Sequence, residues 1–416
     1  MSVGGNYTEL YGTQALFSFM RWYAAVHGYA STVICVIGII FNILNILVLT
    51  RKNMITSTNC ILTGLAVSDM FTMVSYIPFA IHFYCVHGPE DYNDKKFSYP
   101  WSKFLMFHAN FSNITHTCSI WLGVLLSVFR YIFVKCASER GTILSLLRTR
   151  IAVVLVYIGA VVILIPNALS LYIHVTEVPI MDLKNQSDKS IQFNQTVAEN
   201  ATMTLFLLRQ IDKSTQYGYI IMVLNFWIHA ILIKLLPCAL LSIFGYLLIC
   251  TMHVTYKRRQ RLRSFGSGKQ LRHRTREHSR TTRMLVVVII LFLVTELPQG
   301  ILALLSGVQE GFYEAVYYPL GDLMDIVALI NNAINFALYC SMSKQFRDTF
   351  LKMVCGKSSK RIFRQSTFEE SCLQSKVLMP TESVNLTNCA NGSLRANGCH
   401  RSGRLLKKDA SKEDEA

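Results

Sequence analysis

The sequence predicts an all-α membrane protein: a bundle of seven transmembrane helices followed by a short amphipathic eighth helix. Apolar residues make up 52% of the 416 residues and charged residues only 16%, whereas charged residues make up about a quarter of an ordinary soluble domain. Seven apolar stretches are each long enough to cross about 30 Å of hydrocarbon, which takes about 20 helical residues. These stretches are continuous rather than alternating, which excludes a β-barrel.

The predicted helices divide the chain into spans and connecting segments. Hydropathy alone identifies the first and fourth helices, whereas the third, fifth and seventh carry polar residues and depend partly on their flanks. The seven spans are 28–50, 60–84, 104–134, 151–174, 217–252, 284–306 and 316–340. The other segments are an N-terminal segment, a long loop, a basic loop, the amphipathic helix and a disordered tail: 1–27, 175–216, 253–283, 341–355 and 356–416.

The positions of the lysines and arginines predict the orientation. Most of them lie in four segments that fall on one side of a seven-helix bundle: 51–59, 135–150, 253–283 and 341–416. Basic loops stay in the cytoplasm, so we expect a multi-pass plasma-membrane protein with its N-terminus outside and its C-terminus inside the cell. Asn-x-Ser/Thr sites on the expected outer side agree and predict glycosylation at Asn6, Asn185, Asn194 and Asn200.

Ionisable side chains inside the predicted helices call for an explanation, because each costs about 2.5–3.5 kcal/mol at mid-membrane. One explanation is structural: such groups hydrogen-bond helices together, at about 0.6–2 kcal/mol per contact. The other is a binding site. For Lys234 and Glu296 both remain open, as an internal ion pair or as ligand contacts. The full set is Asp69, Arg130, Lys234, Glu296, Asp322 and Asp325.

The spacing of polar residues on three helices favours a ligand site. Residues four apart lie on one face of a helix, as in the third-helix series from His108 to His116. Acids near the outer end of the seventh helix and a deeper acid on the sixth predict an acid-rich cavity that suits a cationic ligand. The predicted ligand-binding residues are His108, Ser112, His116, Glu296, Gln299, Asp322 and Asp325.

Short motifs, in their order along residues 28–355, resemble those of the rhodopsin-like G-protein-coupled receptors. They are Asn42, Leu65-Ala66-Val67-Ser68-Asp69, Phe129-Arg130-Tyr131, Pro237, Phe292 with Pro298, and Asn335-Phe336-Ala337-Leu338-Tyr339. The resemblance implies coupling to a heterotrimeric G protein and to arrestin, with activation through Arg130, Tyr131, Phe292, Pro298, Asn335 and Tyr339. It also implies a sodium site, with a water-filled polar network as the alternative, at Asp69, Ser119, Asn331 and Asn335.

Longer segments resemble the myosuppressin and FMRFamide-type neuropeptide receptors, including nematode relatives. They include Phe107-His108-Ala109-Asn110-Phe111, Lys234-Leu235-Leu236-Pro237-Cys238 and Thr295-Glu296-Leu297-Pro298-Gln299-Gly300. This resemblance implies an amidated neuropeptide that ends in Arg-Phe or a similar pair. The sequence also departs from the wider family: Leu105 stands where a loop cysteine is usual, Phe129 replaces an acid, and Glu296 replaces a tryptophan. The usual loop disulfide is therefore not expected.

The expected cytoplasmic segments carry the remaining predictions. The basic run in 253–283 is expected to extend two helices toward a G protein and anionic lipid, and not to bind nucleic acid. Phe346 and Phe350, with basic residues around them, predict an interfacial helix, and Cys355 beyond it is a palmitoylation candidate.

The sequence leaves alternatives to a peptide receptor. A chemosensory receptor for a small molecule would share the fold, whereas a transporter usually shows an internal repeat that is not seen here. No catalytic motif supports an enzyme, and no cofactor is expected apart from the sodium ion considered above.

Overall fold

The computed structural model describes residues 14–135, 145–179, 202–212, 214–263 and 269–354, and the side chains of all of these except 255–285. The chain divides into two units, Met1–Lys357 and Ser358–Ala416, of which the second lies wholly outside the described residues. The predicted disordered tail lies there too. The predicted glycosylation and palmitoylation sites also lie outside the described residues: Asn6, Asn185, Asn194, Asn200 and Cys355.

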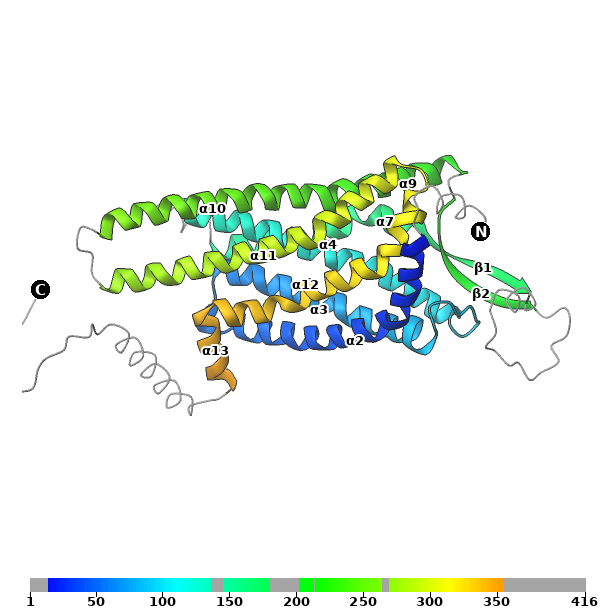
Figure 1. Ribbon diagram of the computed structural model, residues 1–416, viewed down its shortest axis with the longest axis horizontal. Coiled ribbons are helices and arrows are strands. Elements are labelled where there is room, and N and C mark those ends of the chain that lie inside the picture. The colour runs from blue at the N-terminus through cyan, green and yellow to red at the C-terminus, as the bar shows by residue number, and fades with distance from the viewer. Residues whose placement is uncertain (1–13, 136–144, 180–201, 213, 264–268, 355–416) are drawn as a thin grey trace, which may run out of the picture. The chain divides into compact units, whose positions relative to one another are not determined.

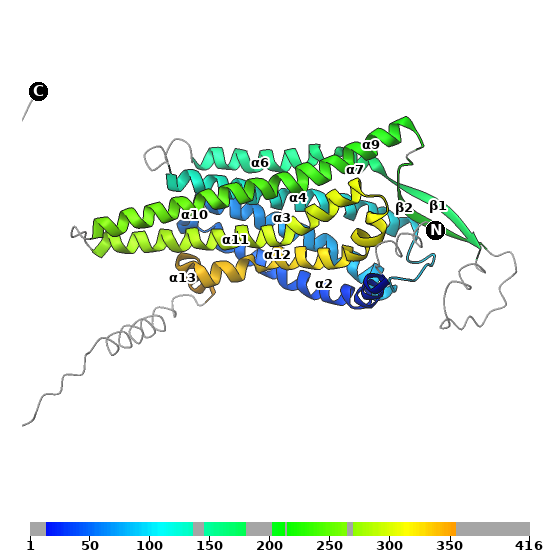
Figure 2. The ribbon, with the colours of Figure 1, turned by 45° about the horizontal axis from the view of Figure 1, so that its top comes forward.

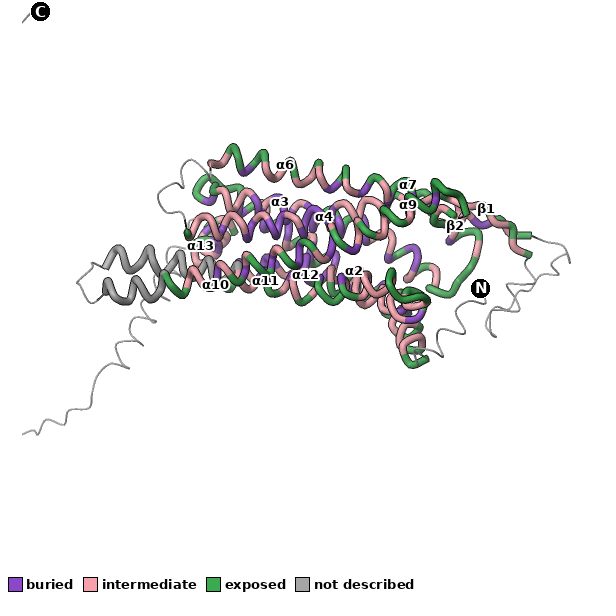
Figure 3. The backbone as a smooth tube through the Cα atoms, turned by 90° about the horizontal axis from the view of Figure 1, so that it is seen from above, coloured by how far each residue is buried: buried purple, intermediate pink, exposed green. Residues whose placement is uncertain are grey.

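The predicted seven-helix bundle is confirmed (Figure 1). Within the described residues, seven helical spans are long and apolar enough to cross a membrane: Gln14–Leu49, Ser57–Val86, Tyr99–Lys135, Leu146–Ser170, Gln216–Val254, Val286–Val308 and Tyr313–Met342. The second and third spans are 61% and 56% buried, against 22% for the fourth, so they form the centre of the bundle and the fourth lies at its edge (Figure 3).

The spans are built from the following elements. The helices are α2 (Gln14–Leu49), α3 (Ser57–Ala80), α4 (Tyr99–Lys135), α6 (Leu146–Ile163), α7 (Ile165–Ser170), α9 (Gln216–Trp227), α10 (Leu236–Arg263), α11 (Lys269–Val308), α12 (Gly321–Met342) and α13 (Lys344–Val354). The π-helical segments are η2 (Ile81–Val86), η3 (Ile228–Leu235) and η4 (Tyr313–Tyr317), and the 3-10 turns are η1 (Lys52–Met54) and η5 (Tyr318–Leu320). The strands are β1 (Leu171–Pro179) and β2 (Thr202–Gln210).

Helix α2 shows how sequence spacing sets the packing. It packs against both α3 and α12. A Cβ atom on Gly28 would lie 2.5 Å from the Cβ of Tyr84, so only glycine permits this close approach between α2 and η2. Most of the buried residues of α2 recur three or four positions apart, which is the spacing of one helix face: Ala24, His27, Gly28, Ser31, Cys35, Gly38, Asn42, Asn45, Val48 and Leu49.

Prolines accompany most of the irregular helical segments. Proline lacks an N–H and disturbs the carbonyl four residues before it, so regular α-helix is hard to maintain there. Segment η2 begins three residues after Pro78, and η3 ends two residues before Pro237. Pro166 opens α7 after a break at Leu164, whereas Pro298 lies inside the continuous helix α11. These breaks reorient the side chains of η2 and η3, which contribute to the site below.

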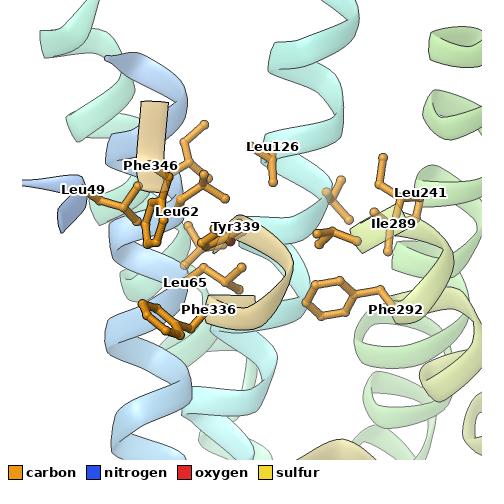
Figure 4. Close-up of a cluster of buried hydrophobic side chains, with 14 of the residues drawn as sticks. Leu49, Leu62, Leu65, Leu126, Leu241, Ile289, Phe292, Phe336, Tyr339 and Phe346 are labelled. Atoms are coloured by element: carbon orange, nitrogen blue, oxygen red, sulfur yellow. The ribbon is translucent and has the colours of Figure 1, made fainter. Parts of the chain in front are cut away.

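A hydrophobic core fills the bundle on the side of α13 (Figure 4). Leucines from α3 and α4 meet Phe292 of α11 and the rings of Phe336 and Tyr339 of α12 there. The ring of Phe346 on α13 lies 5.6 Å from that of Tyr339, so α13 closes this core. By contrast, α6 buries only Thr149 and Ala160 along its length, and its exposed apolar side chains suit contact with lipid.

The segment expected to be a plain loop, 175–216, contains part of a β-hairpin that the all-α prediction missed. Strands β1 and β2 pair antiparallel, with Leu171 opposite Gln210 and Pro179 opposite Thr202. The fourth helix was predicted to reach residue 174, but α7 ends at Ser170 and β1 begins at once. Hydropathy cannot mark this boundary because Leu171, Tyr172 and Ile173 continue the apolar run.

The hairpin is attached to α4 without a disulfide. The amide of Phe206 donates to the carbonyl oxygen of Phe97 at 3.0 Å, and the hydroxyl of Ser102 donates to the carbonyl oxygen of Phe206. The ring of Tyr99 lies 5.4 Å from that of Phe206. The described cysteines are all free: Cys35, Cys60, Cys85, Cys118, Cys238, Cys250 and Cys340. Hydrogen bonds and ring packing therefore hold the hairpin where the wider family uses a covalent link.

The two ends of the bundle differ (Figure 2). One end carries the hairpin and is called the hairpin end; the other carries α13 and is called the α13 end. At the α13 end, α10 continues to Arg263 and α11 begins at Lys269, so much of the basic segment 253–283 extends two helices, as predicted. Helix α13 is tied to the bundle by the 2.9 Å hydrogen bond from the Asn53 amide to the Thr349 hydroxyl.

Candidate functional site

Two half-buried acids of α12 lie nearest the hairpin end, and tyrosine hydroxyls cover both. The hydroxyl of Tyr84 on η2 donates to Oδ1 of Asp322 at 2.8 Å. The hydroxyl of Tyr76 on α3 donates to Oδ2 of Asp325 at 3.1 Å. Nε2 of His27 lies 2.9 Å from the same Tyr76 hydroxyl, and since that hydroxyl already donates its proton, His27 donates to it. Among the described residues, neither acid forms an ion pair.

An aromatic wall is formed by ring side chains of α3 and α4 near these acids. The ring of His108 stacks on Phe79 at 4.6 Å, and its Nδ1 lies 3.3 Å from the hydroxyl oxygen of Ser75. Tyr76 meets His108 edge-on at 5.5 Å. Ser112 lies half-buried one turn further along α4. The predicted series from His108 to His116 therefore shares one face of α4. His108 belongs to the aromatic wall, whereas His116 belongs to the deeper cluster described next.

The deeper level holds a cluster in which three polar side chains surround Lys234. Its ammonium donates to Oε2 of Glu296 at 2.7 Å, to Oε1 of Gln299 at 2.7 Å and to Nε2 of His116 at 3.1 Å. His116, on α4, lies two turns, or about 12 Å, further from the hairpin end than His108. We call these four residues the floor cluster. The ion pair that sequence analysis left open, between Lys234 and Glu296, is present in the structure.

Local structure places Lys234 in this cluster. It lies in the π-helical segment η3, just before Pro237, where the changed helical pitch turns its side chain toward α11. A Cβ atom on Gly300 would lie 3.2 Å from the Cβ of Lys234, so this glycine lets α11 approach η3 closely. Glu296 and Gln299 then reach Lys234 from either side of Pro298.

The positions of the hydrogens in the floor cluster follow from which of its atoms can donate hydrogen bonds and which can only accept them. An ammonium has three N–H groups and accepts nothing, so each of its three neighbours must present an acceptor. This fixes the Oε1 atom of Gln299 toward Lys234, and it leaves the ring proton of His116 on Nδ1. Oε1 of Glu296 is buried and has no hydrogen-bond partner among the described residues. The cluster is thus neutral overall, with all protons of Lys234 in use.

A third level surrounds Asp69 of α3. The hydroxyl of Ser119 donates to Oδ1 at 2.6 Å and the amide of Asn335 donates to Oδ2 at 3.1 Å. Asn331 is buried on the same helix as Asn335. Among the described residues, no lysine, arginine or histidine pairs with Asp69. The carboxylate and hydroxyl oxygens of Asp69 and Ser119 would suit either a hard cation or water molecules.

Two of the predicted switch residues, Arg130 and Tyr131, lie toward the α13 end. Arg130 is buried, with its guanidinium 5.8 Å from the ring of Phe133 and its Nε atom unpaired. The hydroxyl of Tyr131 accepts a hydrogen bond from Lys135 at 2.9 Å, and its ring lies 6.0 Å from that of Phe244. The Phe-Arg-Tyr motif therefore faces the junction of α4 with α10.

Phe292 and Tyr339 connect the floor cluster to this end through the core (Figure 4). Phe292 lies one turn below Glu296 on α11 and packs on Gly123, where an added Cβ would lie 3.6 Å from its ring. Tyr339 is buried one turn beyond Asn335, and its hydroxyl has no partner among the described residues. Pro298 lies between the two side chains of α11 that contact Lys234.

Sequence analysis missed the groups that cover the outer acids. Tyr76 and Tyr84 were treated as part of an apolar helix, and His27 lay just outside the predicted first helix. Tyrosines in an apolar span, spaced to face acids on another span, were the available signal. Lys234 was noticed as an intramembrane charge but was not placed in the ligand set.

Comparisons with known proteins agree with this architecture. Residues 29–357 match the model of a family described as serpentine type 7TM GPCR chemoreceptor Srw. The G-protein coupled receptor dmsr-1 of Caenorhabditis elegans is 32% identical, covering 88% of this chain and 76% of that protein. The Drosophila melanogaster sex peptide receptor is 29% identical, with 80% and 73% covered, and the FMRFamide receptor of the same species is 23% identical, with 78% and 53% covered. With seven membrane-length helices and a family match along most of its length, this chain belongs to the serpentine seven-transmembrane G-protein-coupled receptors of the Srw family.

Proposed function

We propose that this receptor binds an amidated neuropeptide ending in Arg-Phe, or in a similar pair, and transmits its binding to a heterotrimeric G protein. The observation that carries this proposal is the state of the outer acids. Asp322 and Asp325 receive hydrogen bonds only from neutral tyrosine hydroxyls within the described residues. Their negative charge is left for a cationic ligand, as an arginine side chain would supply.

The deeper acid has a different role from the one that the sequence predicted. Glu296 was expected among the groups near the positive charge of the ligand, but Lys234 already neutralises it. The ligand's arginine is therefore assigned to Asp322 and Asp325, and its aromatic end to the wall of Phe79 and His108. Relatives named as sex peptide and FMRFamide receptors support a peptide as the ligand.

The receptor is proposed to sit in the plasma membrane with its hairpin end outside. The lysine and arginine distribution supports this orientation, because the basic helix extensions of α10 and α11 then lie in the cytoplasm. In that orientation Arg130, Tyr131 and the adjoining ends of α10 and α11 face the G protein. Arrestin would bind the C-terminal segment, which lies outside the described residues.

Activation follows from a ligand that prefers one of two states. A peptide above the floor cluster contacts α11 on the outer side of Pro298, and Phe292 packs on α4 on the inner side. Outward movement of the inner part of α11 about Pro298 would take Phe292 away from Gly123 and expose Arg130. The Asp69 level, with its sodium ion or water, would couple to the same change through Asn335.

A G-protein activation assay tests the proposal. Cells that express the full receptor would be challenged with a panel of amidated Arg-Phe peptides, with receptor number at the surface measured in parallel. We expect activation at nanomolar to low micromolar peptide. Asp322→Asn and Asp325→Asn should each weaken potency at equal surface number, with Asp348→Asn on α13 as a matched control. Silence across the panel from a receptor at the surface would contradict the proposal.

A second candidate is a small-molecule chemoreceptor. The description of the matched family favours it, since it names chemoreceptors. The two candidates differ in ligand size: a peptide should also contact the hairpin, whereas a small molecule would occupy only the space between helices. A response to soluble metabolites together with silence to every peptide would select this candidate.

A further inference from the structure

We propose that the floor cluster recognises the C-terminal carboxamide of the peptide and rejects the corresponding free carboxylate. The inference rests on the proposed peptide function. It adds the residues that distinguish an amidated C-terminus from a free carboxylate. Its basis is the hydrogen-bond inventory of Lys234, Glu296, Gln299 and His116, which leaves specific donors and acceptors unused.

Lys234 cannot serve as a carboxylate receptor in this arrangement. Its three N–H groups are directed at Oε2 of Glu296, Oε1 of Gln299 and Nε2 of His116, at 2.7, 2.7 and 3.1 Å. A carboxylate accepts hydrogen bonds but donates none, so it could pair with Lys234 only by displacing one of these partners. The positive charge is also balanced locally, because Glu296 lies in direct contact with it.

The unused atoms match a primary amide. Oε1 of Glu296 is buried without a partner among the described residues, so it offers an acceptor to an incoming N–H group. The Nδ1–H of His116 is the donor left over once Lys234 has taken its Nε2 atom, whereas the side-chain amide of Gln299 also hydrogen-bonds Tyr317. A carboxamide carries two N–H donors and one carbonyl acceptor, and it satisfies both kinds of group at once.

A free carboxylate fails at the same place. Its oxygens would meet Oε1 of Glu296, which is also an unprotonated acceptor, so like charges would face each other in a poorly solvated site. The His116 side chain is 18% exposed and Glu296 only 1%, so His116 is the more accessible of the two to an approaching ligand end. Sites with buried polar groups reject a ligand that leaves them unpaired by large factors, and we expect at least about 100-fold here.

The matching pair of peptides and three receptor variants test this inference. For wild type we expect the amidated form to be at least about 100-fold more potent than the free acid. Glu296→Gln keeps a carbonyl acceptor for Lys234 but removes the negative charge. The ratio of amide potency to acid potency should then fall about 10-fold or more. The double variant Lys234→Gln with Glu296→Gln has no buried charge and should show the same fall. Asp325→Asn, the control, should weaken both peptides and leave the ratio unchanged.

The outcomes separate the two proposals. Equal potency of amide and acid at wild type, or a ratio that survives both floor variants, would overturn the carboxamide assignment while a peptide receptor still stands. If the amide-to-acid potency ratio fell as far in Asp325→Asn as in the floor variants, the carboxamide assignment would also be overturned. Failure of the double variant to reach the surface would also count against it, because the pair would then be needed for folding alone. A wild type that answers no peptide removes the proposed function and this inference with it.

Discussion

Asp69 and Glu296 are both buried acids in the middle of the bundle, and they are stabilised in opposite ways. Glu296 contacts Lys234 at 2.7 Å, so the chain supplies its counter-charge. Asp69 receives hydrogen bonds from Ser119 and Asn335, which are both neutral donors. A buried charge is costly unless it is paired. The charge of Glu296 is therefore balanced within the described chain, although its Oε1 accepts no hydrogen bond there, whereas Asp69 requires a proton, a cation or water.

This difference separates two kinds of function. A self-neutralised pair is a fixed element that can shape specificity without taking up an ion. An acid without a basic partner is a site whose occupancy depends on the solution. The first suits recognition of a neutral ligand group by the floor cluster, and the second suits coupling to sodium.

The largest expected effect comes from breaking the pair. Lys234→Met removes the cation and leaves Glu296 charged and buried, which typically costs about 3–5 kcal/mol. We expect surface expression to collapse and the purified receptor to melt well below wild type. Adding Glu296→Gln to Lys234→Met removes the stranded charge and should restore most of both. Normal expression of the single variant would show that the pair is not what keeps Glu296 in place.

Asp69→Asn should behave in the opposite way. No basic partner is stranded, so the fold should tolerate the change, and sodium should lose its effect. If sodium occupies this site, it should raise the melting temperature of wild type relative to potassium, corresponding to about 1–3 kcal/mol at saturating concentration. Thermal unfolding in the two salts measures this for both proteins. Equal melting temperatures of wild type in sodium and potassium would favour the water-filled network instead.

Asp325→Asn extends the comparison to an acid that faces a ligand. Asp325 is half-buried and held by Tyr76, so loss of its charge should change stability little. Peptide potency should fall about 10-fold to 100-fold, which corresponds to about 1.4–2.8 kcal/mol of a charge-assisted contact. Tyr76→Phe is the matched control, because it removes the hydrogen bond and leaves the acid. A larger loss in Tyr76→Phe than in Asp325→Asn would mean that the tyrosine makes the ligand contact.

The parts that sequence could predict are those that depend on local patterns. Hydropathy located the seven helices, and helical spacing placed His108 and His116 on one face. The partners of these residues depend on how distant helices pack. The contact of Tyr76 with Asp325 was therefore not predicted, and the pairing of Lys234 with Glu296 was left as one of two alternatives. The hairpin was missed because its first strand continues the apolar run of the fourth helix. Segment η3 was missed because a π-helix has the composition of an α-helix.

The smallest effect tests a second buried lysine, which lacks the carboxylate contact that Lys234 has. Lys96, in the loop between η2 and α4, is 3% exposed, and its ammonium donates to the carbonyl oxygens of Gly88 and Pro89 at 2.6 and 3.3 Å. Burial lowers the pKa of Lys96 from 10.5 to about 8, and the charge of Asp91 opposes this only in part. Between these two pKa values the unfolded chain holds the proton and the folded chain does not, so stability rises with pH through this window.

We therefore expect the melting temperature of the purified receptor to rise from pH 7 to pH 9 by more in wild type than in Lys96→Met. A change of about 1 kcal/mol moves the melting temperature of a medium-sized domain by about 2–4 °C, and we expect a difference below that. Comparing the two proteins at each pH cancels the titration of groups distant from Lys96. An identical pH dependence would show that the carbonyl oxygens compensate Lys96 fully, and that a lysine at this end of the bundle needs no acidic partner. Burial of a lysine would then not by itself explain why Lys234 contacts Glu296, and the role of that pair in ligand recognition would be the explanation.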